Sequence, residues 1–209
     1  MQVQWLGSHL EYTAVYQYME ELLHKRIEGE IEDQLLLVEH APTYTVGRAK
    51  NALHNILDAQ NTPVVEITRG GDVTFHGPGQ LTGYPIVKLP IEDINAYLRF
   101  LEQFWIDILH TNNITASRDE RNTGVWVEGK KMVAIGIAMR RWVCWHGFAC
   151  NISVDIDYFS RINPCGMSSN FVTKWIEHQN PPYGSMEEMA LYIGEEFRKK
   201  WHTWVQSFL

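Results

Sequence analysis

One cysteine of this chain lies in a segment where its thiol could act as a nucleophile. Residues 161–166 read RINPCG, and Asn-Pro followed by Cys-Gly predicts a turn that presents Cys165 at its exposed corner. The alternative is that Cys165 is buried as a small apolar side chain, which is the commoner fate of a free cysteine. The local sequence does not separate the two roles, and both stay open at this point.

A nucleophilic thiol needs a neighbour that helps it to ionise, because its unperturbed pKa is about 8.5. Histidine is the usual helper, and His76 and His146 are candidates. Lys131 is another, because it stands just before the apolar run MVAIGIAM. We expect its ammonium to be held at the edge of the core, where desolvation lowers a lysine pKa. The alternative is a strand-end lysine whose ammonium reaches solvent.

A cluster of glycines marks a candidate binding segment. Five of the fifteen glycines fall in RGGDVTFHGPGQLTG, residues 69–83. Ordinary turns alone could explain Gly-Gly and Gly-Pro-Gly. Polar side chains at Arg69, Asp72, His76 and Gln80 stand between the glycines, however, and flanking strands would hold such a loop on rigid elements, as is common for binding sites. The segment is not a nucleotide-binding motif, because neither GxGxxG before a helix nor GxxxxGK[ST] is present.

Three amphipathic segments predict the helices that flank these residues. Ser8 and Glu11 have the spacing of a capping box, and Gly29 is placed to end the helix that follows. The second helix has its apolar face between Leu98 and Leu109 and ends at residues 112–113. Ser185 begins the third helix with another capping box.

The remaining apolar runs predict β-strands that would position the candidate residues. We expect an edge strand at 2–6, strands at 34–39, 43–46, 63–68 and 84–89, and a β-rich stretch over 124–154 with turns at 129–130 and 140–141. Cys144 and Cys150 lie six residues apart in that stretch, so we expect them on one face as buried free thiols. Some of these strands follow one another directly, and others are separated by helices. We therefore predict a mixed α/β (α+β) fold.

Length, composition and charge exclude several classes of protein. The 209 residues suit a single domain over 1–209, and 45% of them are hydrophobic, which argues against disorder. The net charge of −7 argues against nucleic-acid binding. Three cysteines without a CxxC pair argue against a disulfide scaffold and against a typical zinc site. No apolar run approaches the ~20 residues of a membrane span, so we expect a soluble cytoplasmic protein with no membrane partner.

Six segments, taken together and in order, resemble the octanoyltransferases of lipoate biosynthesis, the lipoate-protein ligase B family. They are EHAPTYTVGR (39–48), RGGDVTFHGPGQL (69–81), NTGVWVEGKK (122–131), GKKMVAIGI (129–137), WHGFACNI (145–152) and INPCGM (162–167). The resemblance runs from about Leu37 to Gly166. It implies a single domain akin to the catalytic domain of biotin and lipoate protein ligases. The chain departs from the family at Cys144, where Ser or Thr is usual, and at Cys150, where an aliphatic residue is common.

The resemblance also implies a reaction and its residues. Octanoyl would pass from octanoyl-acyl carrier protein through a thioester on Cys165 to a lysine of lipoyl domains, those of 2-oxoacid dehydrogenases and of the glycine cleavage H protein. Lys131 would lower the pKa of the thiol. No cofactor and no metal is implied. The substrate-binding residues would be Arg69, Gly70, Gly71, Asp72, Val73, Thr74, Phe75, His76, Ala134, Ile135, Gly136, Gly147, Phe148 and Ala149.

Three other functions remain possible from the sequence: an ATP-dependent lipoate or biotin ligase, a non-catalytic acyl- or carrier-binding module, and an amidotransferase that moves octanoyl between two protein lysines. A locally basic stretch is a candidate docking surface for an acidic carrier, although its charges could equally be ordinary solvated turn residues. Its basic residues are Arg118, Arg121, Lys130, Lys131, Arg140 and Arg141, set against Asp119, Glu120 and Glu128.

Overall fold

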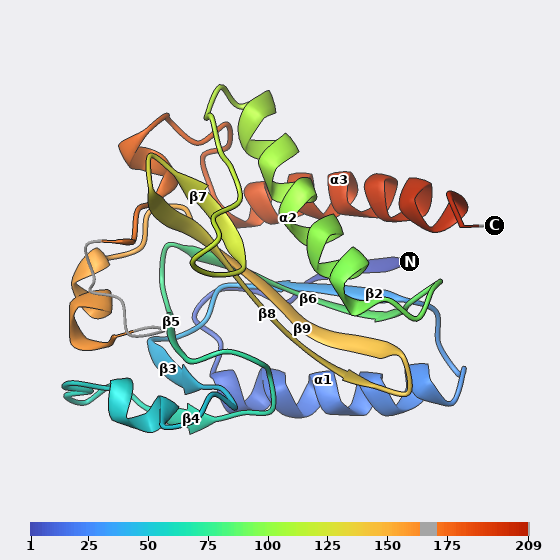
Figure 1. The fold of residues 1–209 in the computed structure, drawn as a ribbon, viewed down its shortest axis with the longest axis horizontal. Coiled ribbons are helices and arrows are strands. Elements are labelled where there is room, and N and C mark those ends of the chain that lie inside the picture. Colours follow the sequence, from blue (N-terminus) through green and yellow to red (C-terminus); the bar gives the residue numbers. More distant parts are fainter. Residues whose placement is uncertain (164–170, 209) are drawn as a thin grey trace.

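The computed structural model describes residues 1–163 and 171–208 and shows a six-stranded sheet between two layers of helices (Figure 1). The strand order is β1-β2-β6-β9-β8-β7. All neighbours pair antiparallel except β1 and β2, which are parallel. The strands are β1 (Gln2–Trp5), β2 (Gln34–Val38), β6 (Gln80–Lys88), β7 (Gly124–Val127), β8 (Lys130–Arg140) and β9 (Val143–Asn151).

Helices cover both faces of this sheet, because its central strands are apolar on both sides. Leu35 and Leu37 of β2 pack into the core beneath α2 (Ile94–Thr111) and α3 (Met186–Gln206). Leu36 and Val38 point the other way, into the core beneath α1 (Tyr12–Ile27). The alternation of successive side chains therefore gives one strand two hydrophobic cores.

A smaller sheet with the order β4-β3-β5 stands beside the large one (Figure 1). Its strands are β3 (Thr43–Val46), β4 (Val64–Glu66) and β5 (Val73–His76). Short 3-10 helices over Ala52–Asn55 and Ile156–Arg161 pack against β5, whereas the 3-10 helix over Trp175–Glu177 buries Trp175 in the core beneath α2 and α3. A third, smaller core lies here and includes Tyr44, Phe75 and Phe159.

Most predicted elements are confirmed, and two expectations are wrong. The helix expected from Ser8 begins only at Tyr12 with no side-chain cap, because Leu10 bonds instead to the backbone beside β2: its N–H donates to Glu39 O at 3.2 Å. Residues 69–83 are not one loop, because residues 73–76 form β5 and pair with β3. Gly29 does follow the end of α1 with φ +77°, and Ser185 does cap α3 through a complete capping box.

Cys144 and Cys150 are buried free thiols in the same core, as predicted. Burial raises the pKa of Cys144 to about 12 and that of Cys150 well above its ordinary value. Within the described part of the chain, none of the helices has the length and apolarity to cross a membrane. The same residues hold no cluster of His, Cys, Asp and Glu side chains fit to bind a metal ion.

Candidate active site

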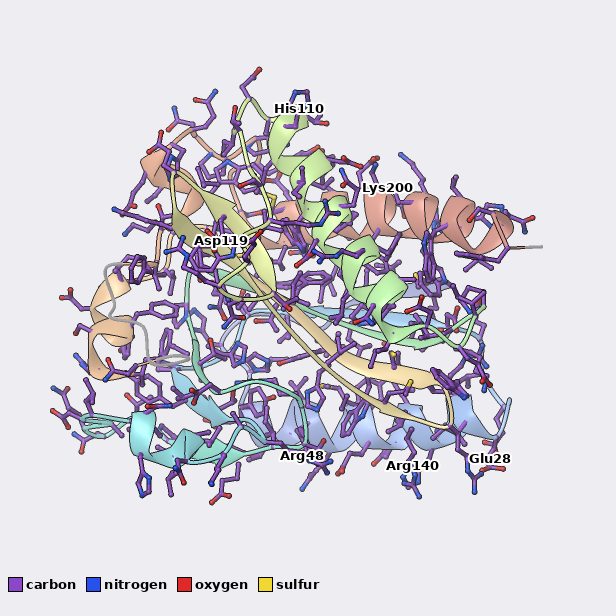
Figure 2. The ribbon with its side chains drawn as sticks, in the orientation of Figure 1. Glu28, Arg48, His110, Asp119, Arg140 and Lys200 are labelled. Atoms are coloured by element: carbon purple, nitrogen blue, oxygen red, sulfur yellow. The ribbon has the colours of Figure 1, made fainter. Side chains whose placement is uncertain are left out.

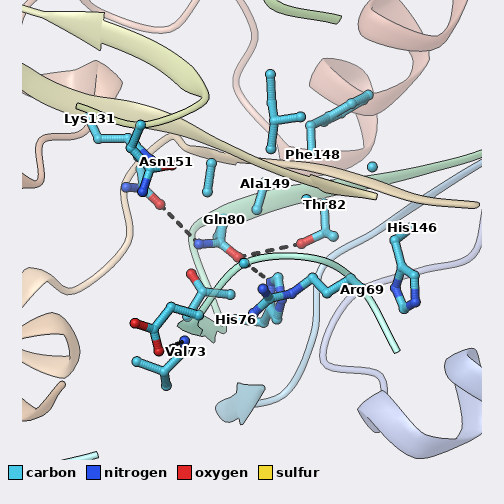
Figure 3. Close-up of a pocket in the computed structure, with 18 of the residues that line it drawn as sticks. Arg69, Val73, His76, Gln80, Thr82, Lys131, His146, Phe148, Ala149 and Asn151 are labelled. Carbon is cyan, nitrogen blue, oxygen red and sulfur yellow. Dashed lines mark hydrogen bonds between the residues drawn. The ribbon is translucent and has the colours of Figure 1, made fainter. Parts of the chain in front are cut away.

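A pocket lies against the middle of β8 and β9 and is closed from the side by the segment that leads into β5 (Figure 3). All but one of the residues implied for substrate binding line it, and so does Lys131. The exception is Phe75. Strand alternation turns its ring into the third core, where it stacks on Tyr158 with ring centroids 4.2 Å apart. Cys165 lies outside the described residues.

Lys131 reaches the pocket because of a β-bulge in β8. Val125 pairs with Val133, but the next residue of β7, Trp126, pairs with Lys131, so Met132 is an extra residue on β8. Met132 and Val133 consequently both face the same core. In a regular strand Lys131 would share the face of Val133 and be buried in that core. The bulge shifts the alternation by one residue and turns Lys131 to the pocket face.

The side chain of Lys131 is half-buried, and Thr123 and Trp126 are among its partners. Its Nζ donates a hydrogen bond to Thr123 O at 3.0 Å and lies 5.0 Å from the centroid of the Trp126 ring. The expectation of a lysine at the edge of the core is therefore confirmed in its position. A lysine held between a carbonyl and a ring keeps its nitrogen in one place, as proton transfer requires.

Two glycines open the pocket by letting neighbouring chain segments approach. A Cβ on Gly147 would stand 2.4 Å from Gly83 O, and a Cβ on Gly136 would stand 3.0 Å from Cδ of Arg69. Both distances are below ordinary van der Waals contact, so neither position tolerates a side chain without movement of its neighbours. Ala134 and Ala149, which pair across β8 and β9, continue the same narrow wall. Small residues thus leave a slot of the kind that a linear alkyl chain can enter.

Arg69 is a buried cation at the side of this slot. Its Nη2 donates to Thr45 O at 3.2 Å and to Thr45 Oγ1 at 3.1 Å, and its Nη1 donates to Gly70 O at 3.0 Å. The guanidinium thereby fixes the Gly70 turn against β3. Its charge also acts on the buried histidines next to the slot.

His76 and His146 are held neutral by their surroundings. Burial, together with the charge of Arg69, lowers the pKa of His146 to about 3. Burial, with the neighbouring His40 and Arg69, lowers the pKa of His76 well below its ordinary value. Groups with such a low pKa are poor proton acceptors near neutral pH. The lowered pKa values therefore argue against His76 and His146 as the helper of a nucleophile.

Comparison with known proteins identifies the family of this chain. Residues 11–198 match the family model described as the lipoyl protein ligase A/B catalytic domain. The chain belongs to this family. It is 39% identical over 207 residues to an octanoyltransferase of Syntrophotalea carbinolica, an alignment that covers 98% of this chain and 96% of that protein. The enzyme is thus an octanoyltransferase of lipoate biosynthesis and works between an acyl donor and acceptor lipoyl domains.

Solved structures confirm the predicted fold at lower sequence identity. Lipoate-protein ligase A bound with ATP aligns with a TM-score of 0.74 and 15% identity, over 96% of this chain and 85% of that one. Biotin protein ligase from Aquifex aeolicus, in complex with biotin and ATP, aligns with a TM-score of 0.59 and 11% identity, over 99% of this chain and 71% of that one. The likeness concerns the fold.

Several pocket residues escaped the sequence interpretation. They come from α1, from β6 and from segments distant in sequence, and they are Tyr12, Thr82, Tyr84, Asn122, Asn151, Phe159, Phe171 and Val172. Three of them had a signal, because Thr82, Asn122 and Asn151 lie in the segments 69–83, 122–131 and 145–152 that the sequence singles out. The others are placed by strand pairing and helix packing, which one sequence does not reveal.

Proposed function

We propose that the enzyme transfers octanoyl through a thioester on Cys165, with Lys131 as the base. The pocket-facing Lys131, turned by the bulge into a slot walled by small residues, is the observation that carries this proposal. An ammonium near a thiol favours the thiolate, and an unprotonated lysine can accept the proton of the thiol. The octanoyl chain would lie along the slot beside Gly136 and Gly147, with its carbonyl at the Lys131 end.

In the first half-reaction the Cys165 thiolate attacks the carbonyl carbon of the donor thioester. A C–S bond to Cys165 forms, the C–S bond to the donor breaks, and the donor thiolate takes the proton that Lys131 holds. The donor we propose is octanoyl-acyl carrier protein. One thioester replaces another, so the acyl group stays activated and no nucleotide is consumed.

In the second half-reaction a free lysine amine attacks the acyl-Cys165 carbonyl. A C–N bond forms, the C–S bond to Cys165 breaks, and the proton lost by the amine passes to Lys131. The acceptors we propose are lipoyl domains of 2-oxoacid dehydrogenases and the glycine cleavage H protein. The oxyanion of each step needs N–H donors. The Gly70 N–H is not one of them, because it donates to Ile137 O at 2.9 Å.

We further propose that residues 1–209 form one catalytic domain and that it works in the cytoplasm. The cores on the two faces share strands β2, β6 and β9 of a single sheet, which supports one domain. A nucleophilic thiol persists in a reducing compartment, whereas oxidising compartments favour disulfides.

Intact-protein mass spectrometry after incubation with octanoyl-acyl carrier protein alone tests the mechanism. We expect one octanoyl adduct, located on Cys165 by peptide mapping, absent in Cys165→Ala and retained in Cys144→Ala. A parallel sample with free octanoate and ATP, but no carrier, should give neither adduct nor transfer to a lipoyl domain. An adduct on Cys144, or one that survives in Cys165→Ala, contradicts the proposal. Octanoate-dependent transfer would indicate a ligase instead.

A further inference from the structure

The chain beside Lys131 changes partner at the position where β9 ends. The antiparallel pairing of β8 with β9 reaches Val133 and Cys150 and stops there. On that edge Lys131 forms a parallel bridge with Val172 instead, and Thr173 N donates to Lys131 O at 3.1 Å. A segment from far along the chain thus takes the place of β9 next to Lys131. Such a short bridge needs support from elsewhere, because it has one residue of pairing rather than a ladder.

Thr173 supplies that support, since each of its polar groups is bonded. It is 1% exposed. Besides the bond to Lys131, its Oγ1 donates to Glu177 Oε2 at 2.8 Å and lies 2.9 Å from His178 Nε2. Because the hydroxyl has a single hydrogen, which goes to the carboxylate, His178 must be the donor in the second contact. The remaining group, Thr173 O, accepts from Asn151 Nδ2 at 3.1 Å.

Asn151 links Thr173 to the buried wall of the pocket, where its side chain meets Gln80 (Figure 3). Its Oδ1 accepts a hydrogen bond from Gln80 Nε2 at 3.0 Å. Gln80 is itself fixed, because its Oε1 lies 2.8 Å from His76 Nδ1 and its Nε2 also donates to Phe75 O at 3.1 Å. The position between Gln80 and Thr173 requires one acceptor and one donor on the same short side chain. An asparagine amide meets that requirement, whereas a carboxylate lacks the donor and an aliphatic side chain lacks both.

We infer that Asn151 is a positioning residue for Lys131. It fixes Thr173 from the last position of β9, and Thr173 fixes the backbone of Lys131 where the β8·β9 ladder has ended. Without the Asn151 amide, Thr173 O loses its partner in a buried site, and the bridge beside Lys131 loosens. The inference rests on the proposed role of Lys131 as the base. Asn151 contributes through Lys131 rather than through the reacting atoms.

The test is a double-mutant cycle of Asn151→Ala and Lys131→Met, read out as the rate of Cys165 acylation by octanoyl-acyl carrier protein. We expect Asn151→Ala to lower the maximal rate roughly tenfold, the scale of one lost buried hydrogen bond, with KM for the donor changed less than about threefold. In the Lys131→Met background the same substitution should have almost no further effect, because residues that act as a unit are not additive.

Gln34→Ala is the matched control. Gln34 is also a buried amide that joins a side-chain amide to a backbone carbonyl: it accepts from Gln4 Nε2 at 3.1 Å and donates to Glu32 O at 2.9 Å. It lies in β2, away from the pocket. We expect it to lower the melting temperature as much as Asn151→Ala does while the acylation rate is unchanged. Amide hydrogen exchange at Thr173 should accelerate in Asn151→Ala and not in Gln34→Ala.

Two results would overturn the inference: an Asn151→Ala rate within twofold of wild type, or a full additional loss in the Lys131→Met background. Asn151→Asp replaces Asn151→Ala if the latter does not fold. It keeps the size and the acceptor for Gln80, lacks the donor for Thr173 O, and should show the same loss. If wild type itself forms no acyl adduct, the proposed function fails and the inference with it. If wild type and Lys131→Met behave as proposed and Asn151→Ala does not, only the inference fails.

Discussion

The two ends of β8 carry adjacent basic residues but differ in burial and in partners. At one end Lys131 is half-buried, turned by a bulge and bonded to Thr123 O. At the other end, about 30 Å away along the strand, Arg141 is exposed and pairs at 3.2 Å with Glu28, which is also exposed. Figure 2 shows Arg140 and Glu28 near the end of α1, far from Asp119. The same charge is thus fixed in a pocket at one end and solvated at the other.

This difference divides the basic stretch that the sequence suggested as one docking surface. Arg118 pairs at 2.9 Å with Glu102, which is buried, and Arg121 pairs at 2.6 Å with Asp119. These two arginines are paired with carboxylates near the Lys131 end of β8. Arg140 and Arg141, in contrast, contact residues at the end of α1. The presence of a basic residue in the sequence does not predict its role. The role depends on how deeply the side chain is buried and on which groups it contacts.

The largest expected effect is that of Lys131→Met. Loss of the base should lower the rate of octanoyl transfer on the order of 10²-fold, the usual scale for general acid–base catalysis. Lys130→Met is the matched control, because Lys130 is the exposed neighbour on the same strand. It should keep the rate within about twofold of wild type. Steady-state rates of both variants check this, and equal losses in the two would show that Lys131 has no special role.

The next effect is a loss of stability in acid that comes from the buried histidines near the pocket. Burial lowers the pKa of His40 to about 4, below the 6.5 of an exposed histidine. A histidine whose folded pKa is lowered stabilises the fold above its unfolded pKa, and this stability is lost as the pH falls. As the pH falls from about 7 to about 5, protonation of His40 in the unfolded chain should lower the free energy of unfolding by about 2 kcal/mol.

Urea unfolding at the two pH values measures this loss, and His40→Gln should reduce it. Exposed His24 of α1, which lies beside Arg140, provides the control. If His24→Gln reduces the pH dependence as much as His40→Gln does, the buried histidines are not its source.

A smaller effect is expected from Gly136→Ala, which adds a methyl group to the slot. Its Cβ would stand 3.0 Å from Arg69 Cδ and 3.3 Å from Gly70 O, so the wall must move by a few tenths of an ångström. We expect KM for an octanoyl thioester to rise roughly fivefold, which is about 1 kcal/mol and the lower limit of what one methylene is worth in an apolar pocket. A shorter acyl chain should lose less. If octanoyl and butanoyl thioesters lose equally, the octanoyl chain does not pass Gly136.

The smallest effect is expected from the double variant Arg140→Glu and Arg141→Glu. Exposed charges at the far end of β8 act mainly on encounter rates and are screened by salt. We expect the maximal rate to stay within about twofold of wild type, both with the carrier donor and with a small octanoyl thioester. A loss confined to the carrier donor and abolished by salt would show that this end of the hairpin receives the carrier after all.

The sequence predicted the sheet and helices well, because apolar periodicity determines them locally. Helix α3 with its capping box, the turn between β7 and β8 and the turn between β8 and β9 follow directly from residue types. The start of α1 could not be predicted, because the N–H of Leu10 donates to Glu39 O. That hydrogen bond joins residues that are distant in the sequence. The pocket residues divide in the same way between local and long-range signals. The glycines and Lys131 line the pocket and lie in segments that the sequence singles out. Nothing local signals that Met132 is the extra residue of a bulge or that Val172 returns beside Lys131.

The central claim is that Lys131 activates the thiol of Cys165, and the pH dependence of alkylation tests it most directly. In the native protein one thiol should react with iodoacetamide, because burial raises the pKa of Cys144 to about 12 and that of Cys150 well above its usual value. Peptide mapping should place the label on Cys165. We predict that wild type reacts with a midpoint clearly below the ordinary thiol value of about 8.5, and that Lys131→Met moves the midpoint up to that value. Coincident profiles for wild type and Lys131→Met would contradict the account.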